Sequence, residues 1–180
     1  MNLPRRAGFA LAGAFLLLAL GSSVASAQDE PAFVPYCFDG GTFEVESGQD
    51  ILLGCGWGAT TKGLMQSFLN SNSKTLVLTD ESGAVVWSLS RSEAADYWSA
   101  LTSGPDGDGL ECAGGVLYGA FWSYTLPALP DGTYTLTTSE TFAHPINDGF
   151  HTCSFDGEAI PAPSKVPATS FDTVLTIVVG

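Results

Sequence analysis

The sequence predicts an all-β domain, an antiparallel β-sandwich of about eight strands with one short crossover helix. Apolar and polar residues alternate in short runs along most of the chain, with the period of a half-buried strand. The 21 glycines and 10 prolines interrupt these runs with turns at intervals of roughly ten residues. Short strands with such frequent turns are typical of a sandwich or a barrel, and not of an α/β enzyme.

Residues 1–27 have the pattern of a secretory signal peptide. A basic head that includes Arg5 and Arg6 precedes the apolar stretch Ala7–Leu20, and Ala25–Ala27 supplies a small-x-small cleavage pattern. We therefore expect residues 1–27 to be removed on export. Residues 28–180 would then form a single domain that is secreted to the extracellular space.

The protein is strongly acidic, with six Lys and Arg residues against 19 Asp and Glu and a formal net charge of −13. Loss of Arg5 and Arg6 with the signal leaves four basic residues and all 19 acidic ones, a net charge of −15. Phosphate contacts need Lys and Arg, so this balance argues against nucleic acid as a partner. No second apolar run approaches the ~20 residues of a membrane span. We therefore expect no membrane-spanning segment after signal cleavage.

Seven runs after the signal alternate as half-buried strands do. In chain order they are Thr42–Glu46, Ile51–Trp57, Lys74–Thr79, Ala84–Leu89, Val116–Leu126, Thr133–Phe142 and Phe171–Val179. The turn-forming segment 80–83 joins the third and fourth runs into a predicted hairpin. Three tryptophans lie in phase with the apolar residues of these strands, so we expect Trp57, Trp87 and Trp122 in the core.

One segment is predicted to be helical. Ser90 and Glu93 have the spacing of a capping box, and Ala94–Leu101 would follow as about two helical turns on a crossover between strands. Gly63–Leu69 is compatible with a short helix or with a strand. The Pro-rich segment 156–169 is expected to be a surface connection.

All four cysteines lie in the exported part of the chain, which indicates two disulfides in an oxidising compartment. Four cysteines allow three connectivities, and the sequence does not choose among them. We favour Cys37–Cys55 and Cys112–Cys153, because each pair flanks strands that are expected to be neighbours. A zinc site is disfavoured, since no close Cys-x-x-Cys pair is present.

The segment Leu129–Thr137 resembles the Gly-x-Tyr strand entry of immunoglobulin-like and fibronectin type III-like sandwich domains of prokaryotic secreted proteins. The resemblance implies that Tyr134 is a tyrosine-corner residue whose hydroxyl bonds back to upstream backbone. Leu136 stands where antibody domains have their second cysteine, so their disulfide is not carried over and the strand order stays open.

A Gly-rich loop brings together the carboxylates of Asp106, Asp108 and Glu111. Hard oxygen ligands on a flexible loop suit calcium, although the spacing of an EF-hand is absent. The alternative is a solvated turn before the next strand. Apart from calcium at this loop, no cofactor is expected.

The two histidines of the chain, His144 and His151, flank the turn signal Asn147-Asp148-Gly149. If the turn folds the chain into a hairpin, both imidazoles and the Asp148 carboxylate form a minimal transition-metal site. The alternative is a pair of plain polar side chains at the surface.

Tyr97 and Trp98 lie on the predicted crossover beside an acidic residue, where burial is harder than on a strand face. Exposed aromatic rings stack on sugar rings, so these two residues are the candidates for glycan contact.

The expected function is that of a secreted, non-enzymatic binding, adhesion or envelope-associated module whose partner is an extracellular protein or a glycan. The alternative is a carbohydrate-binding module, with or without calcium. An enzyme is not expected, because no Gly-x-Ser-x-Gly elbow occurs and no pair of carboxylates stands out for glycosidase chemistry.

Overall fold

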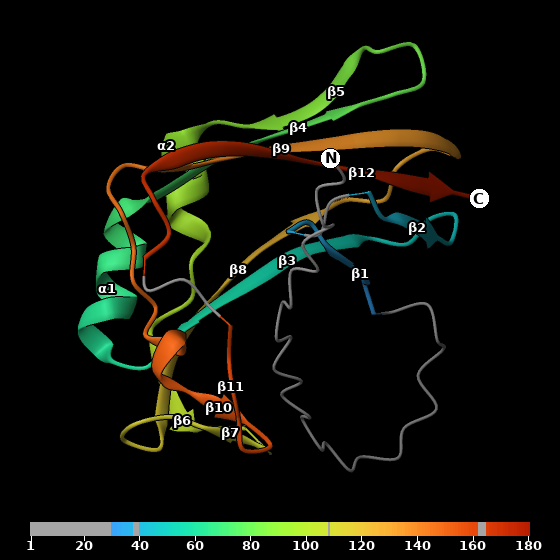
Figure 1. Ribbon diagram of the computed structural model, residues 1–180. Helices are drawn as coiled ribbons and strands as arrows, with labels where there is room; N and C mark the ends of the chain where they lie inside the picture. Colours follow the sequence, from blue (N-terminus) through green and yellow to red (C-terminus); the bar gives the residue numbers. More distant parts are fainter. Residues whose placement is uncertain (1–29, 38–39, 108, 162–164) are drawn as a thin grey trace, which may run out of the picture.

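The computed structural model describes residues 30–37, 40–107, 109–161 and 165–180, so the predicted signal peptide lies outside the described residues. The described chain forms twelve strands, two α-helices and two 3-10 helices. Most strands belong to two larger sheets that lie one above the other, with helix α1 at one end of both layers (Figure 1).

The first sheet has the strand order β1-β3-β8-β6. Its strands are β1 (Ala32–Pro35), β3 (Ile51–Ala59), β8 (Val116–Leu126) and β6 (Thr102–Pro105). Strands β3 and β8 pair antiparallel over their full common length, β6 pairs antiparallel with β8, and β1 pairs parallel with β3.

The second sheet has the order β2-β12-β9-β4-β5. Its strands are β2 (Thr42–Val45), β12 (Thr169–Val179), β9 (Gly132–Phe142), β4 (Asn72–Thr79) and β5 (Val85–Leu89). Every pair is antiparallel except β2 with β12. The β4–β5 hairpin is the predicted one, and its turn projects beyond the rest of the fold (Figure 1).

A small third sheet, β11-β10-β7, lies below the two layers (Figure 1). It consists of the two-residue strands β7 (Leu110–Glu111), β10 (Ser154–Phe155) and β11 (Glu158–Ala159). The pairs are too short to bury a core of their own, and a disulfide next to β7 and β10 links these two strands to each other.

Two α-helices are present among the described residues, where one was predicted. Helix α1 (Lys62–Ser71) resolves the ambiguity of Gly63–Leu69, and its N-cap Thr61 accepts a hydrogen bond from the backbone of Leu64 at 3.2 Å. The capping box of Ser90 and Glu93 is confirmed at α2 (Arg91–Ala94).

The crossover helix is shorter than predicted. Helix α2 continues only as the 3-10 turn η1 (Ala95–Tyr97), whereas two turns over Ala94–Leu101 were expected. Trp98 leaves the helix in an extended conformation and forms a β-bridge to Trp122 of β8. Pairing with the first sheet therefore ends the helix.

The facing sides of the two larger sheets share one hydrophobic core. Ile51, Leu53 and Trp122 contribute from the first sheet, and Leu136 and Ile177 contribute from the second. These are inward positions at period two, as the alternation predicted. A second cluster around Met65 and Phe68 of α1 closes one end of the layers, where the ring of Trp57 stacks on Phe68 at 4.5 Å.

The all-β prediction is confirmed in outline, but an antiparallel arrangement of about eight strands is wrong. Both larger sheets are mixed, since each contains one parallel pair, and twelve strands are described. The parallel pair of β1 with β3 arises because both strands belong to one sheet while the intervening β2 belongs to the other. The chain thus crosses between layers and re-enters the first sheet in its original direction.

Both predicted disulfides are confirmed: Cys37 is bonded to Cys55, and Cys112 is bonded to Cys153. The first joins the end of β1 to β3, and the second joins the segment after β7 to the start of β10. The Tyr134 hydroxyl donates a hydrogen bond to the carbonyl oxygen of Pro130 at 2.8 Å, which is the upstream bond expected of this residue.

Candidate functional site

A lysine is buried between the two larger sheets. Lys74 lies on β4 in phase with Leu76 and Leu78, so its side chain points inward, and only 2% of it is exposed. The register of β4 with β9 places Glu140 directly opposite Lys74. A basic and an acidic side chain therefore meet on the inner face of the sheet.

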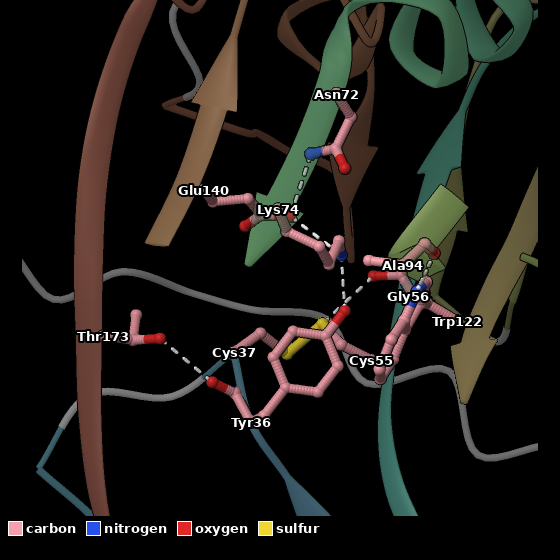
Figure 2. A network of polar contacts seen from close by, with 10 residues as sticks. All are labelled: Tyr36, Cys37, Cys55, Gly56, Asn72, Lys74, Ala94, Trp122, Glu140 and Thr173. Atoms are coloured by element: carbon pink, nitrogen blue, oxygen red, sulfur yellow. Dashed lines mark hydrogen bonds and ion pairs between the residues drawn. A yellow bond between two sulfur atoms is a disulfide. The ribbon is translucent and has the colours of Figure 1, made fainter. Parts of the chain in front are cut away.

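The Lys74 ammonium pairs with the Glu140 carboxylate, and two further polar groups contact this pair (Figure 2). The Nζ atom lies 2.9 Å from Glu140 Oε1 and also donates a hydrogen bond to the Tyr36 hydroxyl. Asn72 Nδ2 donates to the same Glu140 oxygen at 2.8 Å. This cluster, which we call the Lys74 network, satisfies a charge that would otherwise be very costly to bury.

Aromatic rings surround the ammonium on the remaining sides. Its Nζ atom lies 4.5 Å from the ring centroid of Trp98, 4.9 Å from that of Tyr36 and 5.4 Å from that of Trp122. Trp122 is held in place because its indole Nε1 donates to the Ala94 carbonyl at 2.7 Å. The rings exclude water and present their negative faces to the cation.

Burial shifts the pKa values of two members of the Lys74 network. Desolvation lowers the pKa of Lys74, and the attraction of Glu140 opposes this shift. Desolvation raises the pKa of Tyr36 well above its ordinary value of 10.0, and the negative charge of Glu140 adds to the rise. The hydroxyl of Tyr36 therefore stays protonated at physiological pH.

These two shifts predict opposite effects of pH on stability. As pH rises, folded Lys74 loses its proton before unfolded Lys74 does at 10.5, so the free energy of unfolding increases between the two pKa values. Folded Tyr36 keeps its proton longer than unfolded Tyr36, so stability decreases above pH 10.0. Urea titrations of the wild type, Lys74→Met and Tyr36→Phe should separate the two effects.

We expect Lys74→Met to remove the increase in the free energy of unfolding with pH, and Tyr36→Phe to remove the decrease above pH 10.0. Profiles of the same shape in all three proteins would contradict this assignment.

The Lys74 network is inaccessible to a substrate. Tyr36 and Lys74 are buried, and the cavity beside Asn72, Lys74 and Trp98 measures about 30 Å³, enough for one water molecule. Lys74 was not among the functional residues predicted from the sequence, although its phase with Leu76 and Leu78 was a signal of inward placement.

The structure separates the roles of the two aromatic residues that were predicted to contact a glycan. Trp98 is half-buried, with the Lys74 ammonium over its ring, and its ring centroid lies 5.5 Å from that of Phe68 in a T-shaped contact. Tyr97 is 38% exposed, and its ring packs against Tyr124 at 4.8 Å. Of the two, Tyr97 is the one whose ring is open to solvent.

The acidic loop is held by hydrogen bonds of its own. Asp106 accepts a hydrogen bond from the backbone N–H of Cys112 at 3.0 Å, and Glu111 accepts one from the Ser154 hydroxyl at 3.5 Å. Asp108 lies outside the described residues. In the part of the chain that the structure describes, no three His, Cys, Asp or Glu side chains are grouped so that they could hold a metal ion.

The two histidines do not lie on the two strands of a hairpin, so that prediction is wrong. Asn147 and Asp148 instead accept hydrogen bonds from the backbone two residues ahead, and Gly149, with φ of 84°, leads into the 3-10 turn η2 (Phe150–Thr152). Ile146 pairs with Val166. His144 is exposed, whereas His151 is half-buried within η2. The predicted turn is present, but the chain that follows it pairs with β7 and not with the segment before the turn.

A groove of about 510 Å³ opens at the projecting β4–β5 turn. Asp80 and Glu81 line it from this turn, and Asp131 lines it from the segment before β9. Its apolar lining comes from Val86 and from the neighbouring Leu129 and Pro130. We call it the hairpin groove; it combines apolar surface with three carboxylates.

The carboxylate of Asp80 has a structural part in the turn. The Ser82 hydroxyl donates to it at 2.6 Å and lowers its pKa, and the backbone N–H groups of Ser82 and Ala84 donate at 2.9 and 3.0 Å. Asp131 accepts a hydrogen bond from Ser47. The carboxylates of Asp80 and Asp131 are therefore held in position.

Comparison of the chain with protein-family models, with curated proteins and with solved structures found no significant match in any of the three. Among the described residues, no helix is long and apolar enough to cross a membrane. Function is therefore inferred from the chemistry of the described residues.

Proposed function

We propose that this protein is a secreted, non-enzymatic module that binds an extracellular protein through the hairpin groove. The observation that carries the proposal is the groove itself, in which Val86 and Leu129 provide apolar contact beside three carboxylates. A partner segment that alternates apolar and basic residues is complementary to it in both respects. Adhesion or attachment to the cell envelope would follow from such contacts.

Three further features support this proposal. The best-developed polar cluster, the Lys74 network, is closed to substrates, whereas an enzyme needs reactive groups within reach of its substrate. The two disulfides support an oxidising compartment. The hydrogen bond from Tyr134 to Pro130 supports the resemblance to immunoglobulin-like domains, a common architecture of extracellular recognition.

A short basic peptide tests the proposal directly. We expect fluorescein-labelled Val-Lys-Val-Lys-Val-Lys to bind the protein at low salt, and the affinity to fall as salt is added. The double variant Glu81→Gln/Asp131→Asn should weaken binding by about three- to tenfold, since each exposed ion pair contributes little alone. Fluorescence anisotropy measures the affinity. Asp80 is left unchanged because its carboxylate holds the turn.

The matched control for this experiment is Glu44→Gln, which neutralises an exposed carboxylate on β2 outside the groove. It should leave the affinity for the peptide unchanged. Equal weakening by the control and by the groove variant would indicate unspecific attraction to an acidic protein. Absence of peptide binding at low salt would contradict the proposal.

Carbohydrate recognition is the second candidate function. The observation that favours it is a pair of exposed aromatic rings, Phe33 and Phe121, on the outer face of the first sheet. The side chain of Tyr97 is a further exposed ring on the crossover. Calcium at Asp106 and Glu111 would be an additional part of that function.

A further inference from the structure

The outer face of the first sheet carries two exposed phenylalanines side by side. Phe33 on β1 is 52% exposed and Phe121 on β8 is 40% exposed. Their ring centroids lie 6.3 Å apart, with 30° between the ring planes. The two rings therefore form one apolar surface that is open to solvent, which we call the phenylalanine platform.

A glycine of the strand between them determines how the rings lie. A Cβ atom on Gly54 of β3 would come within 2.6 Å of both Phe121 Cζ and Phe33 Cε2. Both rings thus lie over the backbone of Gly54, which is buried although it faces outward. The edge of each ring rests on the sheet, and the rings do not stand out from it as isolated side chains.

The strands around the platform are uncharged. Strand β3 presents Gly56 outward beside it, whereas Gly58 lies under the ring of Phe150, and the outward neighbours on β8 include Ser123 and Thr125. In a protein of net charge −13, the strands β1, β3, β8 and β6 contain no Asp, Glu, Lys, Arg or His. The outer face of these four adjacent strands therefore carries no charged side chain.

We propose that the phenylalanine platform binds the sugar rings of a neutral polysaccharide, without calcium. This inference rests on the second candidate function, carbohydrate recognition. Sugar rings present C–H groups to aromatic faces, and the hydroxyls of Ser123 and Thr125 lie on the same sheet face to meet sugar hydroxyls. A neutral ligand matches a neutral face.

The charge of the rest of the chain argues against two other occupants. A second copy carries the same negative net charge, −13 for the full chain and −15 after loss of Arg5 and Arg6, which opposes self-association. An anionic lipid surface is repelled for the same reason. The platform also lacks carboxylates, so a bridging calcium ion has no ligand there, in contrast to the loop of Asp106 and Glu111.

Retention on insoluble cellulose, chitin and xylan, in calcium and again in EDTA, tests this proposal. We expect the residue 28–180 protein to be retained equally in both buffers. Phe33→Ala and Phe121→Ala should each weaken retention by about tenfold, and Phe121→Tyr should preserve it, because the ring is kept. Gly54→Ala should also weaken binding, since its Cβ displaces both rings without removing either.

Val85→Ala is the matched control, because Val85 is an apolar residue on the second sheet that is 61% exposed, more than either phenylalanine. Thermal unfolding of each variant separates lost binding from lost folding. Retention that persists in both Phe→Ala variants would overturn the platform as the site while leaving carbohydrate recognition in place. No retention on any of the three polysaccharides would overturn both.

Three further outcomes would overturn the proposal in favour of another occupant or another site. A dimer that dissociates on Phe121→Ala, measured by sedimentation, would assign the platform to self-association. Phe33-dependent binding to phosphatidylcholine vesicles would assign it to a membrane. Retention that is lost in EDTA would move the site to the acidic loop.

Discussion

Replacement of Glu140 by leucine is expected to lower the free energy of unfolding by about 3–5 kcal/mol. The Lys74 ammonium is 2% exposed, and Glu140 is its counter-charge at 2.9 Å. Leucine removes this charge and leaves the ammonium with the Tyr36 hydroxyl and three aromatic rings, which cannot replace water. Urea unfolding, followed by tryptophan fluorescence with the disulfides intact, measures the loss.

The control removes Lys74, Glu140 and Tyr36 together, so that only the half-buried Asn72 of the Lys74 network remains. The triple variant Lys74→Met/Glu140→Leu/Tyr36→Phe leaves neither an unpaired charge nor an unpaired hydroxyl in the core. Apolar replacement of a buried ion pair is often neutral or stabilising, so the triple variant should recover most of the stability lost in Glu140→Leu. Losses that simply add would mean that these side chains do not act as one unit.

The Lys74 network also shows which features of the site could be predicted from the sequence and which could not. The phase of Lys74 with Leu76 and Leu78 is visible in the sequence, and so is that of Glu140 with Leu136. Alternation predicts which face a residue occupies, but not which strand lies opposite. The partner of Lys74 is 66 positions away, and the register of β4 with β9 alone brings the two together.

Strand direction was the part of the fold that alternation did not predict. A strand has the same period whichever way it runs, so the parallel pairs of β1 with β3 and β2 with β12 left no pattern in the sequence. Strand β1 has only four residues, too few for a recognisable period. The disulfide pairing was predicted correctly, but the strands that bring the cysteines together are β1 with β3 and β7 with β10, and β1, β7 and β10 were not predicted.

The exposed aromatic residues were harder to predict than the buried ones. Trp122 and Phe121 are adjacent in the sequence, and alternation assigns Trp122 to the core and Phe121 to the outside. The meaning of Phe121 depends on Phe33 and Gly54, which are brought beside it only by the pairing of β1, β3 and β8. Such a surface is a property of three strands and is invisible in any one of them.

Removal of the Cys112–Cys153 disulfide is expected to cost more stability than removal of Cys37–Cys55. The first closes a loop of 41 residues and the second a loop of 18. Restriction of the unfolded chain then gives losses of about 4 and about 3 kcal/mol respectively. The longer loop contains β8 and β9, the strands that carry Trp122 and Glu140. Urea unfolding of the paired Cys→Ala variants measures both losses.

Which disulfide causes the larger loss of stability on removal distinguishes two explanations of how these disulfides stabilise the fold. If chain entropy dominates, the variant with both Cys112→Ala and Cys153→Ala unfolds at lower urea than its counterpart. The reverse order would mean that the small sheet β7-β10-β11 opens on its own before the core, so that its disulfide restrains little beyond itself. Cys37–Cys55 would then be the dominant restraint, because it adjoins Tyr36 and the Lys74 network. Hydrogen exchange of Ser154 and Phe155 amides distinguishes local opening from global unfolding directly.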